Sequence, residues 1–511
     1  MLAKVWSSAT LGIDAVRIII EVDSRTCTGQ PGFTLVGLPD AAVRESYSRV
    51  RSALYHCGYY LPQRHITVNL SPADVRKEGS GFDLPIALGI LLASEHLTEG
   101  LMDGRLFVGE LSLDGSVAPV RGTLSISSSL ARDRTIQELI VPLANANEAA
   151  AVESVRVIGV PHLPALIDHL RGESRLPAAK SIPATEPAIE PADFAEVRGQ
   201  AQAKRALEVA AAGGHNVMMI GPPGSGKTML AKRLPSILPR LSLEESIETT
   251  KIHSVAGTLS PGSGLLMRRP FRAPHHTISN AGLVGGGSMP KPGEVSLAHH
   301  GVLFLDELPE FRRDVLEVMR QPMEDGIVTI ARALRTLTFP SRFTLAAALN
   351  PCPCGYFNDG RRPCTCGDQQ ISRYLGRISG PLLDRIDLQV EVPALSTEEI
   401  ASTTMGEPSS AIRERVETAR EVQRERFRRT AIQCNAEMTS RHLRKHCELD
   451  PASRKILEQA IERLNLSARA YDRILKVSRT IADLAAVEKI DAAHVSEAVQ
   501  YRALDRAYFR S

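Results

Sequence analysis

A glycine-rich stretch, GPPGSGKT at residues 221–228, limits what this chain can fold into more than any other segment. It follows the apolar run 217–220 and precedes residues 229–234, which suit a helix. A glycine-rich loop between a buried strand and a helix lets successive backbone N–H groups converge on a phosphate. The pattern therefore predicts an α/β fold that binds a nucleotide through Gly221, Pro222, Pro223, Gly224, Ser225, Gly226, Lys227 and Thr228.

A second motif, VLFLDE at residues 302–307, places two carboxylates directly after four apolar residues. Open α/β sheets bind their ligands at the carboxyl ends of the buried strands. We therefore expect Asp306 to hold Mg²⁺ together with the Thr228 hydroxyl, and Lys227 to reach the β- and γ-phosphates. Glu307 is the candidate general base that polarises the attacking water. Taken alone, the motif would equally suit an ordinary strand followed by a helix.

The chain has 511 residues, enough for about three domains. A stretch rich in Pro, Ala and Glu indicates a linker, and helical periodicity replaces the strand-and-loop pattern after Pro393. The linker stretch would also suit a long surface loop within one domain. The predicted organisation is a first domain at 1–172, a linker at 173–192, a P-loop domain at 193–395 and a helical domain at 396–511.

Composition excludes a membrane protein and predicts a cytoplasmic one. No apolar run reaches the roughly 18–20 residues of a membrane span, and Asp14 and Arg17 interrupt the N-terminal apolar stretch. The formal net charge of +3 is too small to indicate nucleic-acid binding, which would have to rest on local patches. Eight cysteines in a cytosolic chain should be reduced thiols.

Four of these cysteines form two closely spaced pairs. The arrangement is Cys352-x-Cys354, nine residues, then Cys364-x-Cys366. Four thiolates folded around one ion are the ligand set of a structural zinc site. Because the spacing departs from the commoner Cys-x₂-Cys pairs, free thiols are the alternative.

Helical periodicity near the C-terminus singles out one arginine. Ser467 is a natural N-cap for a helix whose apolar positions Ile474, Val477 and Ile481 recur at intervals of three and four. Arg469 then falls in the first turn, where the helix dipole disfavours a cation. A residue placed against its local preference is a functional candidate, although a plain surface arginine is the alternative.

Several longer strings make the chain resemble the magnesium-chelatase-like branch of the AAA+ ATPases, and within it the ComM/YifB group. They are FRAPHHTISNAGLVGGG (271–287), HHGVLFLDELPEF (299–311), ALNPCPCGY (348–356), SGPLLDRIDL (379–388) and LSARAYDRILKVSRTIADL (466–484). The resemblance implies a Lon-protease-like α+β domain, a central AAA+ P-loop α/β domain and a C-terminal helical lid. It also implies a hexameric ring that acts as a DNA helicase and branch-migration motor in DNA uptake and recombination.

The resemblance assigns three further site residues. Asn350, after the apolar strand 344–349, matches sensor 1 and would orient the attacking water. Arg385 matches the arginine finger, which would neutralise transition-state charge in a neighbouring subunit. Arg469 matches sensor 2, which in this branch is thought to act across the subunit interface. Taken singly, Asn350 would also suit a strand-end cap and Arg385 a surface ion pair.

A DNA motor needs basic surfaces that face its track. Two insertions are candidates for loops lining the pore, 265–293 with Arg268, Arg269 and Arg272, and 328–343 with Arg332 and Arg335. Such loops would grip the phosphates of single-stranded or branched DNA without reading sequence. Loops that only form the subunit interface are the alternative.

Two other groups of residues receive a structural interpretation. The arginines of 413–429 alternate with glutamates three or four residues away, which indicates a self-paired, solvated helix face. The pairs His275-His276 and His299-His300 could suggest a metal site, but adjacent side chains on a strand or helix point in different directions and cannot easily chelate one ion. We therefore interpret them as nucleotide-linked packing or DNA contacts.

The first domain resembles the proteolytic domain of Lon through SPADVRKEGSGFDLPIALGIL (71–91) and VGELSLDGSVAPVRGTL (108–124). Lon needs a serine nucleophile and a lysine base. Those positions fall at or beside Gly81 and at Leu124, and Ser80 is a weak substitute. We therefore expect a non-catalytic module.

Two rival functions remain open. One is an ATPase that drives metal insertion into a porphyrin, although the resemblance implies that such subunits lack a Lon-like domain. The other is an ATP-dependent protease or protein remodeller, and the absent lysine argues against proteolysis.

Overall fold

The computed structural model describes residues 2–26, 32–60, 64–77, 79–131, 133–153, 155–180, 192–260, 264–287, 290–332, 335–396, 398–399, 405–464 and 466–509. The chain divides into two compact units. The first unit contains residues 1–186 and 242–267, and the second contains 187–241 and 268–511. The chain therefore leaves the second unit at residue 241 and returns to it at 268, which the sequence did not indicate. The predicted boundary at 396 falls inside the second unit and stays a prediction.

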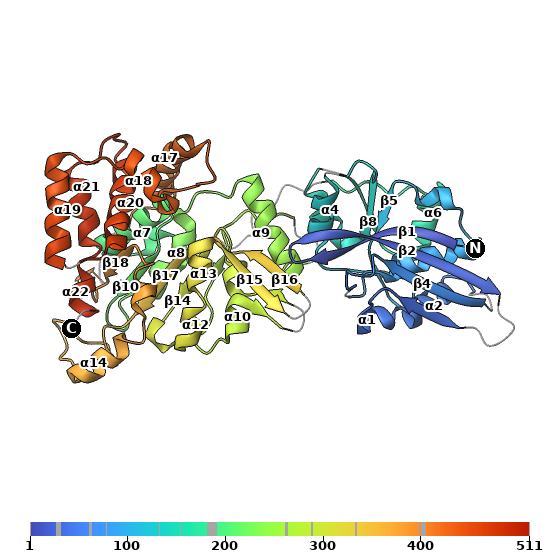
Figure 1. Ribbon diagram of the computed structural model, residues 1–511, viewed down its shortest axis with the longest axis horizontal. Coiled ribbons are helices and arrows are strands. Elements are labelled where there is room, and N and C mark those ends of the chain that lie inside the picture. The colour runs from blue at the N-terminus through green and yellow to red at the C-terminus, as the bar shows by residue number, and fades with distance from the viewer. Residues whose placement is uncertain are drawn as a thin grey trace. The chain divides into compact units, whose positions relative to one another are not determined.

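An antiparallel β-sheet with one parallel edge strand forms the base of the first unit (Figure 1). Its strand order is β1 (Leu2–Leu11), β2 (Asp14–Thr26), β4 (Arg64–Ser71) and β3 (Phe33–Val36). Helices α1 (Ala41–Arg44) and α2 (Ser46–His56) follow β3. Helix α3 (Asp83–Ala93) is buried along its whole length. A Cβ on Gly89 would lie 2.5 Å from Cγ2 of Val22, so glycine lets α3 approach β2 closely.

A smaller parallel sheet completes the first unit, with the order β5 (Arg105–Phe107), β8 (Glu138–Pro142) and β9 (Arg156–Val160). This unit also contains the short pair β6 (Glu110–Leu111) and β7 (Val117–Ala118) and the helices α4 (Thr123–Leu130), α5 (Ala146–Ala150) and α6 (Leu163–Arg171). The predicted linker is partly ordered, because Ala179 N donates to Val157 O of β9 at 2.8 Å. Its residues 181–191 lie outside the described ones.

Helix α9 (Leu243–Ala256) belongs to the first unit although it follows the P-loop helix in sequence. A capping box between Ser242 and Glu245 begins α9, which packs against α4. The Ser254 hydroxyl donates to the buried carboxylate of Glu148, which also accepts the backbone N–H of Leu124 at 3.1 Å. Because a buried carboxylate needs such donors, Glu148 anchors α9 to this unit.

The second unit is built on a five-stranded parallel sheet. Its order is β11 (Phe271–Arg272), β14 (Val302–Leu305), β17 (Thr344–Leu349), β10 (Val217–Ile220) and β18 (Leu388–Glu391). The three central strands are fully buried and have the predicted bounds. Two antiparallel hairpins accompany the sheet, β12 (Gly285–Gly286) with β13 (Lys291–Pro292), and β15 (Ile327–Arg332) with β16 (Arg335–Pro340).

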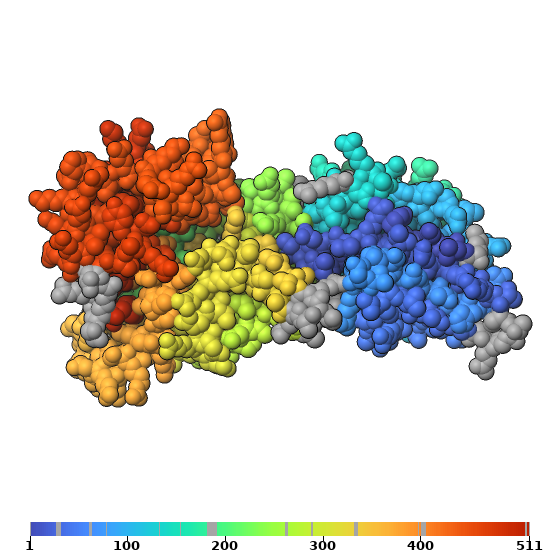
Figure 2. All heavy atoms as spheres, viewed as in Figure 1, coloured from blue at the N-terminus to red at the C-terminus, as the bar shows by residue number. Residues whose placement is uncertain are grey.

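Helices surround this sheet. Those between the P-loop and residue 385 are α8 (Lys227–Ile237), α10 (Asn280–Val284), α11 (Glu294–Leu297), α12 (Arg313–Glu317), α13 (Arg320–Asp325), α14 (Asp368–Leu375) and α15 (Gly380–Leu383). The C-terminal helices, coloured from orange to red in Figure 2, lie together at one end of the second unit. They are α17 (Ser409–Phe427), α18 (Ser440–His446), α19 (Pro451–Leu464), α20 (Ala468–Leu484), α21 (Ala492–Gln500) and α22 (Leu504–Tyr508).

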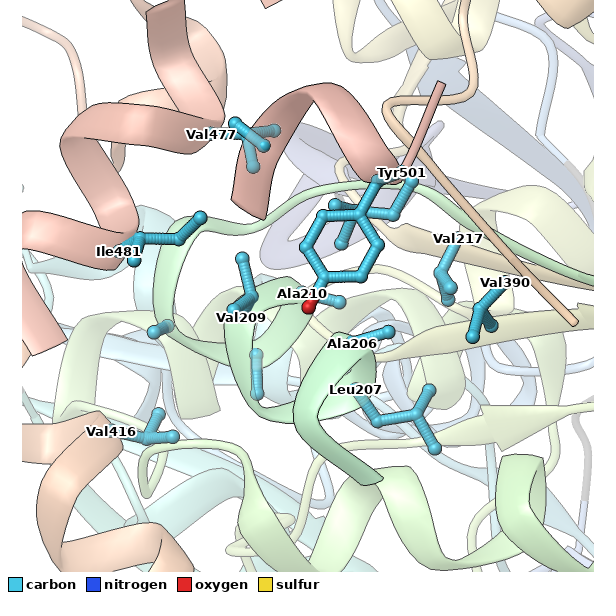
Figure 3. Close-up of a cluster of buried hydrophobic side chains, with 14 of the residues drawn as sticks. Ala206, Leu207, Val209, Ala210, Val217, Val390, Val416, Val477, Ile481 and Tyr501 are labelled. Atoms are coloured by element: carbon cyan, nitrogen blue, oxygen red, sulfur yellow. The ribbon is translucent and has the colours of Figure 1, made fainter. Parts of the chain in front are cut away.

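Helix α7 (Ala201–Gly213) joins the sheet to the C-terminal helices (Figure 3). It packs against β10 and β18 on one side and against α17 and α20 on the other. Its Val209 and Ala210 belong to the same buried cluster as Val477 and Ile481 of α20. This apolar contact places α20 at a defined position relative to the P-loop strand. Among the described residues, no helix has the length and apolar character needed to cross a bilayer.

Candidate functional site

The P-loop turns from β10 into α8 in a way that only glycine permits. A Cβ on Gly221 would lie 2.1 Å from Val392 O, so any side chain would collide with the backbone after β18. Gly226 is the N-cap of α8 and has a φ of +93°. The loop therefore leads the chain directly into a helix N-terminus, where unpaired N–H groups and the helix dipole favour an anion.

Lys227 lies at the centre of this loop with only 8% of its surface exposed. Its Nζ donates to Gly221 O at 2.7 Å, to Pro222 O at 2.9 Å and to Asn350 Oδ1 at 3.2 Å. Burial lowers the pKa of Lys227 to about 8, while the charges of Asp306 and Glu307 act in the opposite direction. Phosphate oxygens accept a charged hydrogen bond more strongly than neutral carbonyls, so a nucleotide would restore the full charge.

The magnesium ligands expected from the sequence lie together. Thr228 Oγ1 donates to Asp306 Oδ2 at 2.6 Å, although 78 residues separate the two positions. A hydroxyl and a carboxylate on adjacent elements are the hard oxygen donors that Mg²⁺ takes alongside nucleotide phosphates. The residues therefore fit an Mg²⁺–ATP complex, with Lys227 and the P-loop amides holding phosphate and Thr228 and Asp306 holding the ion.

The backbone of Glu307 has an unfavourable conformation. Its φ of +50° is left-handed, which is uncommon for a residue with a side chain and is concentrated at functional sites. Its N–H donates to Asp306 Oδ1 at 2.9 Å, which ties the two acidic residues together. The Glu307 carboxylate is 55% exposed and lies 3.6 Å from His276 Nδ1. A carboxylate with this access to water is suited to act as a general base.

The contact with His276 was not anticipated. The ring centroids of His275 and His276 are 4.0 Å apart and those of His299 and His300 are 3.9 Å apart. The expectation that neighbouring histidine side chains point apart was therefore wrong, because neither pair lies in a regular strand or helix. His276 comes after β11 and Glu307 after the neighbouring strand β14, and no sequence pattern relates the two residues.

Asn350 and Asp306 follow adjacent strands, as predicted. Strand β17 lies between β10 and β14, so its carboxyl end carries Asn350 next to both the P-loop and Asp306. The contact of Asn350 Oδ1 with Lys227 Nζ places its amide beside the lysine that is expected to reach the phosphates. Its role as sensor 1 stays a prediction.

Arg385 lies near the amino-terminal ends of the parallel strands, whereas the P-loop lies at their carboxyl ends. Its carbonyl accepts a hydrogen bond from Asn216 Nδ2 at 2.9 Å, and Asn216 comes just before β10 while the P-loop comes just after it. The four residues of β10 span about 10 Å at the usual rise of a strand. Arg385 therefore does not join Lys227 and Glu307 in the site of its own chain.

Arg469 lies in the first turn of α20 and is exposed. Ser467 Oγ accepts the N–H of Ala470 at 3.3 Å, which confirms the predicted N-cap. Because a cation in this position is not stabilised by its own helix, its placement is consistent with an interaction outside the chain.

The four cysteines expected to bind zinc form one cluster. Their sulfur atoms all lie within 4.8 Å of one another, and Cys352 Sγ is 3.3 Å from Cys354 Sγ and 3.7 Å from Cys364 Sγ. Four sulfurs around a tetrahedral zinc ion are separated by about 3.8 Å. Backbone N–H groups of Thr365 and Tyr356 lower the pKa of Cys354 to about 5. The donor set thus fits a structural zinc ion.

The cysteine cluster supports the P-loop directly. A Cβ on Gly355 would lie 2.5 Å from Cδ of Pro223, so the loop between the two cysteine pairs packs tightly on the phosphate loop. Gly355 also has a φ of +86°, which a side chain would disfavour. The structure therefore connects the cluster to the nucleotide site through Pro223 as well as through Asn350.

Two arginines expected to face DNA hold the second unit together. Arg269 donates to Pro239 O at 2.6 Å and to His300 O at 2.7 Å. Arg272 forms a two-pronged ion pair with Glu294, with distances of 2.6 and 2.7 Å. These bonds give both arginines a structural role within the chain, which a count of charges does not show, and their assignment as DNA contacts stays a prediction.

The other basic features agree better with expectation. The predicted strand–turn–strand at 328–343 is the β15–β16 hairpin, whose backbone register sets Arg332 opposite Arg335. The side chains of these two arginines lie outside the described ones. Helix α17 is self-paired only in part, with Arg424 bonded to Glu421 as predicted and Arg428, in place of Arg429, lying 3.5 Å from Glu425. Other arginines of this helix bond neighbouring elements: Arg415 bonds Glu208, Arg420 bonds Ala211 O and Arg426 bonds Asp483.

The Lon-like part of the first unit has an apolar environment at the former nucleophile position. A Cβ on Gly81 would meet Cγ1 of Val108 at 3.4 Å and Cγ1 of Val120 at 3.6 Å. Leu124, at the expected lysine position, is fully buried. The Ser80 hydroxyl donates to the carboxylate of Glu110. These surroundings fit the expected loss of proteolytic chemistry.

Comparisons with known proteins extend over the whole chain. Family models described as magnesium chelatase subunit ChlI, subunit ChlI of Mg-chelatase and magnesium chelatase subunit ChlI C-terminal match residues 193–400, 20–145 and 406–502. Competence protein ComM of Haemophilus influenzae is 46% identical over 512 aligned residues, which cover 99% of this chain and 98% of the relative. The uncharacterized protein YifB of Escherichia coli is 43% identical over 506 residues, with the same coverage.

A partial match concerns Lon. Lon protease 2 of Bacillus subtilis is 32% identical over 159 residues, which are 28% of this chain and 27% of that protein. This agrees with the predicted fold class of a Lon-like α+β part, a P-loop α/β part and C-terminal helices. The match to magnesium-chelatase-type AAA+ proteins implies that the cofactors are ATP and Mg²⁺. The geometry around Lys227 and Asp306 fits these two cofactors. On these full-length matches, the chain belongs to the ComM/YifB family of magnesium-chelatase-like AAA+ proteins.

Proposed function

We propose that this protein is an ATP-hydrolysing motor that assembles as a homohexameric ring and moves along single-stranded or branched DNA. Within each chain, Lys227 and the P-loop amides would bind the phosphates, and Thr228 and Asp306 would hold Mg²⁺. Glu307 would draw a proton from the attacking water while Asn350 orients that water. Arg385 and Arg469 would complete the site of a neighbouring subunit.

The position of Arg385 carries the ring proposal. Its backbone carbonyl accepts a hydrogen bond from Asn216, at the amino-terminal end of β10, whereas the nucleotide site lies at the carboxyl end of that strand. A finger in that position serves ATP hydrolysis only when a second copy brings its own P-loop to it. Repeating such a head-to-tail contact between copies closes a ring when the rotation from one copy to the next divides a full turn.

The β15–β16 hairpin is the best candidate for the DNA contact. Its register sets Arg332 opposite Arg335, and like charges across a hairpin are unfavourable unless an anion lies nearby. Phosphates of a nucleic acid would supply that anion regardless of sequence. The Haemophilus relative, which matches nearly the whole chain, carries competence in its name. These observations support DNA as the track.

Neutralising Arg332 and Arg335 should weaken binding to forked DNA and lower its dependence on salt. Each lost phosphate contact removes roughly one unit from the slope of log affinity against log salt, so we expect a loss of about two units. ATP hydrolysis without DNA should persist, because neither residue belongs to the nucleotide site. A salt titration with fluorescent forked DNA measures both quantities.

The matched control neutralises Arg424 and Arg428, which are equally cationic but paired on the exposed face of α17. That variant should bind DNA as the wild type does. Equal affinities and slopes in all three proteins would exclude the hairpin as the DNA contact. A wild-type protein that binds no DNA at low salt would refute the DNA motor itself.

A chelatase-type ATPase is the second candidate, because all three matching family models are described as magnesium chelatase subunits. One of these models covers residues 20–145, which lie in the first unit. The presence of this unit therefore does not distinguish a DNA motor from a chelatase subunit, contrary to the expectation from sequence. The deciding comparison is whether forked DNA or a chelatase partner subunit raises the ATPase rate. Stimulation by the partner subunit alone would favour chelation.

We also propose that the cysteine cluster holds one structural zinc ion. Four thiolates leave no open position for substrate, so the ion would brace the loop that supports Pro223 and Asn350. Metal analysis should find about one zinc per chain.

Replacing Cys364 with Ser should lower both the zinc content and the thermal midpoint of unfolding. A chelator should lower the wild-type midpoint and have little further effect on the variant, because metal binding contributes to folding. Cys447 is a buried cysteine outside the cluster, and Cys447→Ser is the control that should keep its zinc. Active protein with four titratable thiols and no zinc would disprove the assignment.

A further inference from the structure

The guanidinium group of Arg385 is already engaged within its own chain. Its Nη1 donates to Pro381 O at 2.7 Å, and its Nη2 bonds the carboxylate of Glu324. Only 14% of the Arg385 side chain is exposed. Each terminal nitrogen therefore already uses one of its N–H groups within the chain, and the ion pair holds the guanidinium group at Glu324, whereas an arginine finger must reach the phosphate of the neighbouring subunit.

Glu324 connects this arginine to the hairpin proposed to contact DNA. It lies in α13, which ends at Asp325, and only the C-cap Gly326 separates this helix from the start of β15 at Ile327 (Figure 1). A displacement of the hairpin is therefore passed to the last turn of α13 through a single residue. The Glu324 side chain is 61% exposed, so water or a shift of the helix can replace its contact with Arg385 at small cost.

The second arginine expected to act across the interface lies near the same carboxylate. The pKa of Glu324 is lowered mainly by the hydrogen bond from Arg385, and the charge of Arg469 contributes further. Arg385 and Arg469 are 84 residues apart in sequence by their numbers and come from different parts of the second unit. The charges of both predicted interface arginines thus favour the ionised carboxylate of Glu324.

We propose that Glu324 is a positioning residue that holds Arg385 away from the neighbouring nucleotide until DNA displaces the β15–β16 hairpin. The carboxylate and the γ-phosphate are anions that compete for one guanidinium group. Movement of α13 with the hairpin breaks the ion pair and frees Arg385 for the phosphate. This mechanism rests on the proposed ring and DNA track, and it makes Glu324 the connection between them.

Glu324→Gln should raise the ATPase rate of assembled rings in the absence of DNA by about two- to fivefold, the range expected for an exposed ion pair. The KM for ATP should stay unchanged, because the residue does not touch the nucleotide site. The factor by which forked DNA stimulates the rate should fall correspondingly. Glu324→Asp, which keeps the charge, should restore part of the wild-type behaviour.

Two controls make the test specific. Asp325→Asn removes one charge at the next position of α13 and should leave both rates unchanged. In an Arg385→Ala background, Glu324→Gln should have no effect, because the group it restrains is missing. Thermal midpoints and ring assembly are measured for every variant, since loss of fold lowers a rate and cannot raise it.

The outcomes separate this proposal from the proposed function. A lower or unchanged basal rate in Glu324→Gln would overturn the restraining role, as would an equal increase in the Arg385→Ala background. If DNA fails to stimulate the wild type, the DNA motor is refuted. The basal rates and the double variant, which need no DNA, would then still decide whether Glu324 restrains Arg385.

Discussion

Replacing Glu307 with Gln should leave ATP bound and lower its hydrolysis by about a hundredfold or more, the usual contribution of a general base. Gln keeps the size of the side chain and the backbone N–H that bonds Asp306 at 2.9 Å. The P-loop, Lys227 and Thr228 are unchanged, so the cradle for the phosphates remains. The loss should therefore appear in kcat and not in the affinity for ATP.

The measurement combines a turnover assay with binding of a fluorescent ATP analogue. Glu310→Gln is the matched control, since Glu310 follows three residues later and pairs with Arg377 at 3.0 Å on the surface. That variant should hydrolyse ATP at nearly the normal rate. Normal turnover in Glu307→Gln would show that another group activates the water, and His276, 3.6 Å from the Glu307 carboxylate, would be the next candidate to test.

The nucleotide-binding half of the site was predictable because each of its residues follows a short apolar run. The runs at 217–220, 302–305 and 344–349 became buried strands with those same bounds. In a parallel sheet, the residues that follow the carboxyl ends of the strands all lie on the same side of the sheet. Local sequence therefore indicated that Lys227 and Asp306 would lie close together.

Contacts between distant segments carried no such signal. The ion pair of Arg385 with Glu324 joins residues 61 positions apart, and neither lies in a pattern that requires the other. Arg269 and Arg272 were predicted to contact DNA from their charge, and composition did not show the intrachain partners that both residues have. Helix α9 was placed in the P-loop domain because its buried face is largely polar, including Ser246, Thr249 and Thr250, and so does not reveal what it packs against.

Arg385→Ala should bind ATP normally and lose hydrolysis by on the order of a thousandfold, the lower end of the range for an arginine finger. The residue lies across the sheet from its own P-loop, so its removal leaves the contacts of Lys227 intact. This variant alone would not distinguish a finger that acts on a neighbour from one that stabilises its own chain. Mixing it with a second inactive protein makes that distinction.

Lys227→Ala is the second protein, because it lacks the phosphate contact and keeps an intact Arg385. In a ring formed from equal amounts of both, about a quarter of the interfaces pair an intact P-loop with an intact finger, if head-to-tail assembly is random. The mixture should therefore recover roughly a quarter of the wild-type rate, provided that subunits exchange before the assay. Two proteins that are each nearly inactive would become active only by sharing a site.

The control for the mixture is a chain that carries both Lys227→Ala and Arg385→Ala. Mixed with Arg385→Ala it should give no recovery, because no subunit then supplies a finger. Equal activity in the two mixtures would mean that the recovery comes from assembly and not from composite sites. Absence of recovery at any ratio, with mixed rings confirmed by mass, would place the function of Arg385 within its own chain. Its hydrogen bond from Asn216 and its ion pair with Glu324 would then be structural contacts that stabilise the amino-terminal ends of the strands and helix α13.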